Sequence, residues 1–170
     1  MKVTSAHANK ILRQLNEEKD YWINVENESM LYTASVNEEP VIPEYDYEKV
    51  SAKIESIDKK ICKIKHAINL SNISSEVEVG GENITIDALL VRMAQITKRK
   101  NMLGKMRKQL PKSRVEGDYY SNKSFVEYRY ANYDIEKVME DYDKISQLLF
   151  EMQMKLDEHN QTVLFELDIE

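Results

Sequence analysis

The stretch YEKVSAKIESIDKKICKIKHAI, residues 47–68, decides the fold of this chain. Its apolar side chains alternate spacings of three and four residues, and five of them are isoleucine. The seam that they form consists of Tyr47, Val50, Ile54, Ile57, Ile61, Ile64 and Ile68. Such a seam predicts a long helix that packs along another helix. Asp46 is the expected N-cap, and Pro43 limits any extension toward the N-terminus.

Three other segments have a helical apolar period. They run over residues 4–26, 86–110 and 135–163, and the last is roughly 40 Å long at the usual rise per residue. Capping and breaking residues fit these bounds, since a side-chain oxygen precedes each helix and a proline follows one of them. These residues are Thr4 or Ser5, Thr85 and Asp134 at the beginnings, and Pro111 after the segment 86–110.

The connections between these helices predict short strands. The stretch EVEVGGENITI alternates apolar and polar residues around Gly80 and Gly81, which indicates a small hairpin tip. SMLYTASV (29–36) and KSFVEYRYA (123–131) are rich in strand-forming residues, so we expect them to pair as a ribbon beside the helices. The predicted fold is mainly all-α. It has long antiparallel helices with heptad seams in a four-helix, coiled-coil-like bundle, a small β-ribbon and a hairpin tip, within a single domain over residues 1–170.

The stretch TKRKNMLGKMRKQLPKSR, residues 97–114, contains eight Lys or Arg residues and no acidic residue. The whole chain has a net charge of -6, so the residues outside this run sum to -14. A chain this acidic repels polyanions at long range, and we expect no specific nucleic-acid binding. A solvated or interhelical basic face is the favoured interpretation. The alternative is a nucleic-acid or protein contact through Lys98, Arg99, Lys105, Lys108, Lys112 and Arg114.

Two residues of the basic run fall on the apolar seam of the helix that contains it. Lys100 and Arg107 take a positions, where a charge lowers stability but fixes register and partner number. We expect their long side chains to reach carboxylates beside the facing seams, with Asp58 and Asp141 as candidates. The residues predicted to set register and oligomeric state are Lys100, Leu103, Arg107, Leu149 and Leu156.

Motifs of catalysis and metal binding are missing from the sequence: there is no HExxH, CxxC, GxSxG, P-loop or GxGxxG. His159 lies on a seam, where we expect a buried imidazole with one ring nitrogen satisfied. Cys62 flanks a seam as a structural or tolerated thiol. We therefore predict no enzyme, no cofactor and no catalytic, cofactor-binding or metal-binding residue. Five tyrosines serve either ribbon packing or partner contact: Tyr119, Tyr120, Tyr128, Tyr130 and Tyr133.

The cellular setting is predicted from cysteine content and apolar runs. A single cysteine, Cys62, excludes an intrachain disulfide and fits a reducing cytoplasm. We expect no classical signal peptide, because the first eighteen residues have no apolar core segment. No run of eighteen apolar residues is present, so we expect no membrane partner.

Three motifs occur in an order that resembles the septicolysin-like family of bacterial proteins. They are HAINLSN (66–72), ITIDALLVRM (84–93) and the stretch 133–167 that begins YDIEKVMEDYD. The matching residues are Ile68, Asn69, Asn72, Asp87, Ala88, Leu89, Arg92, Asp134, Ile135, Asp143, Leu156, Asp157, Asn160, Thr162 and Leu164. Gln161 replaces the family's Trp and Met93 replaces its Asp. The resemblance covers roughly residues 60–165 and implies a helical fold and, by the family name, a pore-forming haemolysin.

Regular seams on long helices leave apolar surface that one thin bundle does not cover. We therefore expect a non-enzymatic interaction or scaffold protein that forms a homo-oligomer, a dimer or higher, or that binds another protein. The alternatives are pore formation, as the family name implies, and RNA or DNA binding through residues 97–114.

Overall fold

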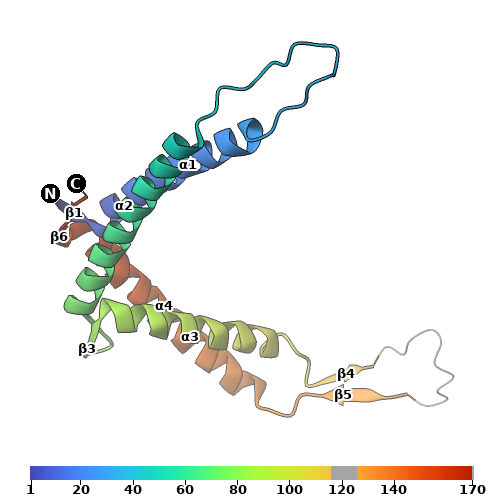
Figure 1. Cartoon of the computed structure of the whole chain (residues 1–170). Coiled ribbons are helices and arrows are strands. Elements are labelled where there is room, and N and C mark those ends of the chain that lie inside the picture. The colour runs from blue at the N-terminus through green and yellow to red at the C-terminus, as the bar shows by residue number, and fades with distance from the viewer. Residues whose placement is uncertain (116–125, 170) are drawn as a thin grey trace. The chain divides into compact units, whose positions relative to one another are not determined.

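The computed structural model describes residues 1–115 and 126–169. The described chain is mostly helical with small antiparallel strand pairs, as predicted (Figure 1). Its elements are β1 (Lys2–Thr4), α1 (Ser5–Ser29), α2 (Tyr47–Ser74), β2 (Glu76–Val79), β3 (Glu82–Thr85), α3 (Ile86–Met106), β4 (Lys112–Arg114), β5 (Tyr128–Tyr130), α4 (Ile135–Thr162) and β6 (Leu164–Glu166). The chain divides into two compact units. Unit 1 is Met1–Ser75 with Asp157–Glu170, and unit 2 is Glu76–Leu156.

All four helices begin where their N-caps predict. In each case a side-chain oxygen accepts a hydrogen bond from the backbone N–H three residues later, which satisfies a free donor of the first turn. The four bonds are His7 N to Thr4 Oγ1 (3.2 Å), Lys49 N to Asp46 Oδ1 (3.0 Å), Ala88 N to Thr85 Oγ1 (3.3 Å) and Lys137 N to Asp134 Oδ1 (3.1 Å).

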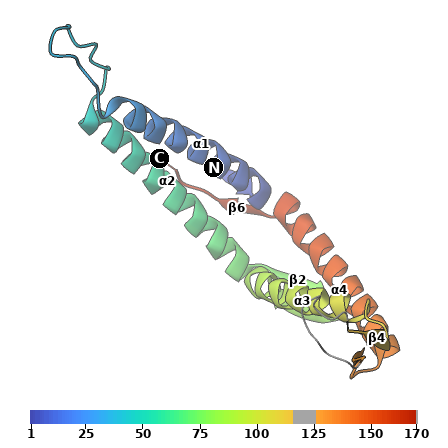
Figure 2. The same ribbon diagram turned by 90° about the vertical axis from the view of Figure 1, so that its right-hand side faces the viewer.

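The core of unit 1 lies between α1 and α2, which run side by side in both views (Figures 1 and 2). The predicted seam of α2 faces this core, where Ile57, Ile61 and Ile64 are buried against Ala8 and Leu12 of α1. One apolar stripe on each helix thus holds this long and charged helix pair together. Trp22, the single tryptophan of the chain, packs on the edge of this core.

The chain ends of unit 1 form a strand pair that the sequence analysis did not predict. β1 and β6 pair antiparallel, with Val3 opposite Phe165. The terminal amino group of Met1 donates a 2.8 Å hydrogen bond to the Leu167 carbonyl, and the Leu167 N–H donates to the Met1 carbonyl at 2.8 Å. Val3 and Leu167 are both buried in the core of unit 1, so this pair seals one end of the α1–α2 core.

Unit 2 contains the predicted hairpin tip. β2 and β3 pair antiparallel across Gly80 and Gly81, whose φ angles are 59° and 82°. Positive φ at both central residues is the requirement of a type I′ turn, which glycine meets without a Cβ clash. The Gly80 N–H donates a 3.0 Å hydrogen bond to a Glu151 carboxylate oxygen on α4. The second core lies beside this hairpin and includes Val79, Ile86, Leu89 and Met152.

The predicted ribbon between residues 29–36 and 123–131 is wrong. Residues 31–46 form an extended loop with a turn near Ser35, and the apolar side chains of Leu31 and Val36 are exposed. β5 pairs instead with β4, so the ribbon belongs to unit 2, with Ser113 opposite Arg129. Residues 123–125 lie outside the described residues.

Helix α3 ends at Met106, four residues before the predicted end at Leu110. The Met106 carbonyl accepts hydrogen bonds from the Tyr133 hydroxyl at 2.9 Å and from the Gln109 N–H at 3.1 Å. A tight turn and a side chain thus satisfy the carbonyl that would continue the helix. Leu110, predicted on the seam, is exposed as a consequence.

Candidate functional site

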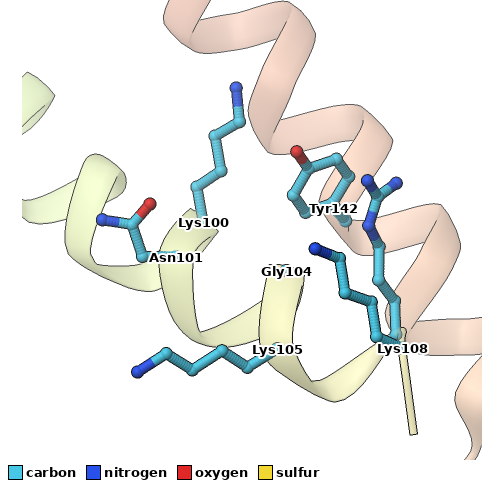
Figure 3. A pocket seen from close by; sticks show the side chains of 7 residues that line it. Lys100, Asn101, Gly104, Lys105, Lys108 and Tyr142 are labelled. Atoms are coloured by element: carbon cyan, nitrogen blue, oxygen red, sulfur yellow. The ribbon is translucent and has the colours of Figure 1, made fainter.

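A cavity of about 250 Å³ lies at the C-terminal part of α3, where α4 faces it with an aromatic ring (Figure 3). Its lining belongs entirely to unit 2 and consists of Lys100, Asn101, Gly104, Lys105, Arg107, Lys108 and Tyr142. We call this cavity the basic pocket. Four of its seven lining residues carry a positive charge and none is acidic, so it is strongly electropositive.

The helical period of α3 creates this concentration of charge. Residues three and four apart share a helix face, so Lys100, Gly104 and Arg107 face α4 together. Gly104 is the residue that admits the ring, since a Cβ added there would lie 3.4 Å from Tyr142 Cε2. A larger side chain at Gly104 would push Tyr142 away from α3.

The two a-position cations contact an aromatic ring. Arg107 places its guanidinium carbon 3.8 Å from the centre of the Tyr142 ring, and the Lys100 ammonium lies 5.6 Å from it. Both are cation–π contacts, each worth about 0.5–2 kcal/mol. Figure 3 shows the Lys100 ammonium rising beside the hydroxyl end of Tyr142, and the Lys108 ammonium on the other side of the ring.

The carboxylates expected for Lys100 and Arg107 have other partners. Asp58 pairs with Lys19 at 2.6 Å, and Asp141 pairs with Lys137 at 3.1 Å. Lys137 is one turn from Asp141 on the same helix, which makes it the closer cation. Our candidates for the counter-charges of the basic run are therefore corrected: the structure shows Tyr142 as the contact of both cations.

The predicted contact residues of the basic run are divided between the basic pocket, the exposed surface of α3 and strand β4. Lys105 and Lys108 line the basic pocket, whereas Lys98 and Arg99 are exposed on α3 outside its lining. Lys112 on β4 lies over the rings of Tyr128 (4.1 Å) and Tyr130 (5.4 Å). Arg114, the last predicted contact residue, is exposed at the end of β4.

The remaining predicted residues occupy varied environments. Leu103 is fully buried, and Leu149 and Leu156 are half-buried on α4. Of the five tyrosines, Tyr133 caps α3 and Tyr128 and Tyr130 hold Lys112, while Tyr119 and Tyr120 lie outside the described residues. Sequence reasoning did not single out Tyr142. Its a position on the expected helix was the available signal, but an aromatic residue there indicates core packing first.

His159 differs from its prediction in hydrogen bonding. Its side chain is buried, as expected, but neither ring nitrogen has a hydrogen-bond partner among residues 1–115 and 126–169. The expected bond to one ring nitrogen is therefore not formed within the described chain. Cys62 is exposed as a free thiol.

The described residues contain neither a cluster of metal-ligand side chains nor a helix suited to a membrane. Within the described ranges, no group of three or more His, Cys, Asp or Glu side chains is arranged to hold a metal ion. In the same ranges, no helix combines the length and apolar character needed to cross a bilayer.

Comparisons with known proteins relate the chain to one solved fold. No protein-family model matches it, and no curated protein matches it. A solved structure that it resembles is the crystal structure of a functionally unknown conserved protein from Corynebacterium diphtheriae, with a TM-score of 0.67. The match covers 98% of this chain and 100% of that chain at 13% sequence identity. At this identity the likeness shows a shared fold.

Proposed function

We propose that the protein is a non-enzymatic interaction protein that assembles with a second copy of itself in a two-fold dimer. The observation that carries this proposal is an exposed apolar stripe on α4. Met139, Phe150 and Met154 expose 49%, 69% and 55% of their surface. Unit 2 also exposes large apolar side chains elsewhere, such as Leu90, Val91 and Met102 on α3, but the three on α4 lie along one side of that helix.

The stripe is a second apolar face of α4, separate from the face that packs in the core. Met139 and Phe150 are eleven residues apart, which is close to three helical turns, and Met154 follows one turn later. Val138 and Met152, which are buried, point to another side of the helix. A helix with two apolar faces requires two neighbours, and α3 accounts for one of them.

The charge pattern favours a second copy as the other neighbour. The run 97–114 carries +8 and the other residues sum to -14, so one copy offers basic and acidic surface to another. A two-fold arrangement would let each basic segment meet acidic surface of its partner while the two α4 stripes pack together. Helices paired in this way would complete the bundle with coiled-coil packing that the heptads predict. Membership of the septicolysin-like family and a cytoplasmic location stay predictions alongside this proposal.

Light scattering coupled to size-exclusion chromatography tests the proposal on the full chain. At micromolar concentration we expect a mass of twice the 20.0 kDa chain. Phe150→Lys combined with Met154→Lys should give a monomer with an unchanged helical circular dichroism spectrum, because both side chains are exposed and their charges would repel across the interface.

A matched control uses exposed apolar residues elsewhere. Val36→Lys with Val41→Lys adds the same charge in the loop 31–46, where both side chains are exposed, and should leave the dimer intact. A wild-type monomer at micromolar concentration would contradict the proposal, as would a dimer that the α4 double variant leaves unchanged.

A further inference from the structure

We propose that the basic pocket on α3 binds a small anion with at least two phosphate groups, such as a pyrophosphate. The inference goes beyond self-assembly. The pocket and the apolar stripe use different side chains of unit 2, but the pocket belongs to the basic segment that would meet acidic surface of the partner in the proposed dimer, so binding and assembly are measured separately.

The charge of the pocket is the first argument. Lys100, Lys105, Arg107 and Lys108 line about 250 Å³ with no carboxylate among the lining residues. Like charges that line one pocket repel one another, and this repulsion persists in part through water. The C-terminal end of α3 compensates about half of one elementary charge through the helix dipole. None of the four cations forms an ion pair within residues 1–115 and 126–169, so several positive charges lack a counter-charge in the described chain. A multivalent anion supplies that compensation, and a monovalent one does not.

The position of Arg107 is the second argument. Its guanidinium is held against the Tyr142 ring at 3.8 Å, so its orientation is set before any ligand arrives. A guanidinium held at this distance over a ring keeps N–H donors that the ring does not use, and phosphate oxygens accept such donors in pairs. Lys100 stands beside the same ring, and the Tyr142 hydroxyl next to it is a further donor (Figure 3).

The size of the pocket fits a small anion. Its volume of about 250 Å³ equals that of about eight water molecules in the liquid. A pyrophosphate or a similarly short phosphate chain fills such a space. A duplex nucleic acid would need a longer basic track, whereas Lys98 and Arg99 lie outside the lining and Lys112 is engaged by Tyr128 and Tyr130.

Isothermal titration of the full chain with pyrophosphate at low ionic strength is the test. We expect saturable binding that weakens as salt increases. Lys100→Gln with Arg107→Gln should weaken binding at least about tenfold, because two charge-assisted contacts are lost. Tyr142→Leu keeps every charge and should weaken binding by about three- to tenfold, since Arg107 loses the ring that orients it.

The control has the same charge change on the same helix. Lys98→Gln with Arg99→Gln lies outside the lining and should keep the dissociation constant within about twofold. Circular dichroism and light scattering on each variant report whether it folds and assembles as the wild type does.

Four outcomes would overturn the inference. The first is that the wild type shows no saturable binding of pyrophosphate, and the second is that the control variant loses as much pyrophosphate affinity as the pocket variant. The third is that the pocket variants dissociate the assembly while their affinity for pyrophosphate is unchanged. The fourth is that the protein binds a single-stranded oligonucleotide or anionic phospholipid vesicles but does not bind pyrophosphate. The third outcome would show that the pocket binds carboxylates of a second copy of the chain. The fourth would show that it binds the phosphates of a nucleic acid or of a membrane surface.

Discussion

The two helix pairs place lysines beside a facing helix but give them different partners. In unit 1, Lys19 of α1 meets Asp58 of α2 at 2.6 Å, and the charges cancel. In unit 2, Lys100 and Arg107 contact the ring of Tyr142 on α4, and neither forms an ion pair with another residue that the structure describes. An ion pair neutralises a helix face, whereas a ring orients a cation and leaves it free to attract an anion. The difference separates a structural contact from a candidate site.

The largest expected effect on stability comes from shortening one buried side chain in each unit. Ile64 in unit 1 and Leu103 in unit 2 are both almost fully buried. We expect Ile64→Ala and Leu103→Ala each to lower the free energy of unfolding by about 2–5 kcal/mol, because each leaves a cavity. Urea denaturation followed by circular dichroism measures both losses.

Trp22 fluorescence assigns each loss to a core, since Trp22 packs on the core of unit 1. The urea midpoint followed by Trp22 fluorescence should fall in the Ile64→Ala variant and should change less in the Leu103→Ala variant. Leu31→Ala, at an exposed residue, should change stability by less than about 0.5 kcal/mol. Equal midpoint shifts by both probes in both core variants would instead support the single cooperative domain predicted for residues 1–170.

The salt dependence of stability should differ between Lys19, which pairs with Asp58, and Lys108, which forms no ion pair within the described part of the chain. Lys19→Gln should lower stability by about 0.2–1 kcal/mol at low salt, because an interhelical ion pair is lost. Lys108→Gln should raise it by up to about 0.5 kcal/mol, because one of four mutually repelling charges is removed.

Both differences should shrink as salt is raised, since screening weakens attraction and repulsion alike. Thermal unfolding at low and high salt measures them, with the exposed Lys98→Gln as the control on α3. The same sign of change for Lys19→Gln and Lys108→Gln would remove the distinction between the two helix pairs.

The smallest expected effect concerns the end of the α1–α2 pair. Partial desolvation of the Tyr45 phenol and the 2.9 Å hydrogen bond that it donates to Glu26 raise the pKa of Tyr45 above its ordinary value. The folded state therefore favours the protonated phenol. Its contribution to stability is complete below the ordinary tyrosine pKa of about 10 and is lost as pH rises through the folded pKa.

Thermal unfolding between neutral and strongly alkaline pH measures this contribution. The loss of stability at alkaline pH should be smaller in Tyr45→Phe than in the wild type, because the phenylalanine has no proton to lose. Tyr21→Phe, at an exposed tyrosine of α1, is the matched control and should follow the wild type. An identical alkaline loss in wild type and Tyr45→Phe would show that the Glu26 bond contributes nothing.

Local features were predictable from the sequence. The seam of α2, the caps Thr4, Asp46, Thr85 and Asp134, and the Gly80–Gly81 turn each depend on residues within a few positions of one another. Short-range rules of period, capping and turn conformation are sufficient for such elements.

Long-range features were not predictable. β1 and β6 are strands of three residues from opposite ends of the chain, too short to show an alternating pattern. The partner of Lys100 and Arg107 was predicted to be a carboxylate, because opposite charge is the usual expectation for a buried cation. Which side chain of α4 stands over Gly104 depends on how the two helices pack, and that is decided only in three dimensions.

The backbone angles of the turn between β2 and β3 determine whether an L- or a D-residue can replace its glycines. Gly80 and Gly81 both have positive φ, and an added Cβ at either place would meet no atom within 4 Å. Space is therefore no obstacle to a side chain, and stereochemistry alone decides which one is accepted. An L-alanine there would be strained, whereas a D-alanine introduced by chemical ligation would adopt these dihedral angles as its natural ones. The turn thus has backbone angles that D-residues favour, although the rest of the chain is built from L-residues. A D-residue there would stabilise the folded protein, because it restricts the conformations of the unfolded chain.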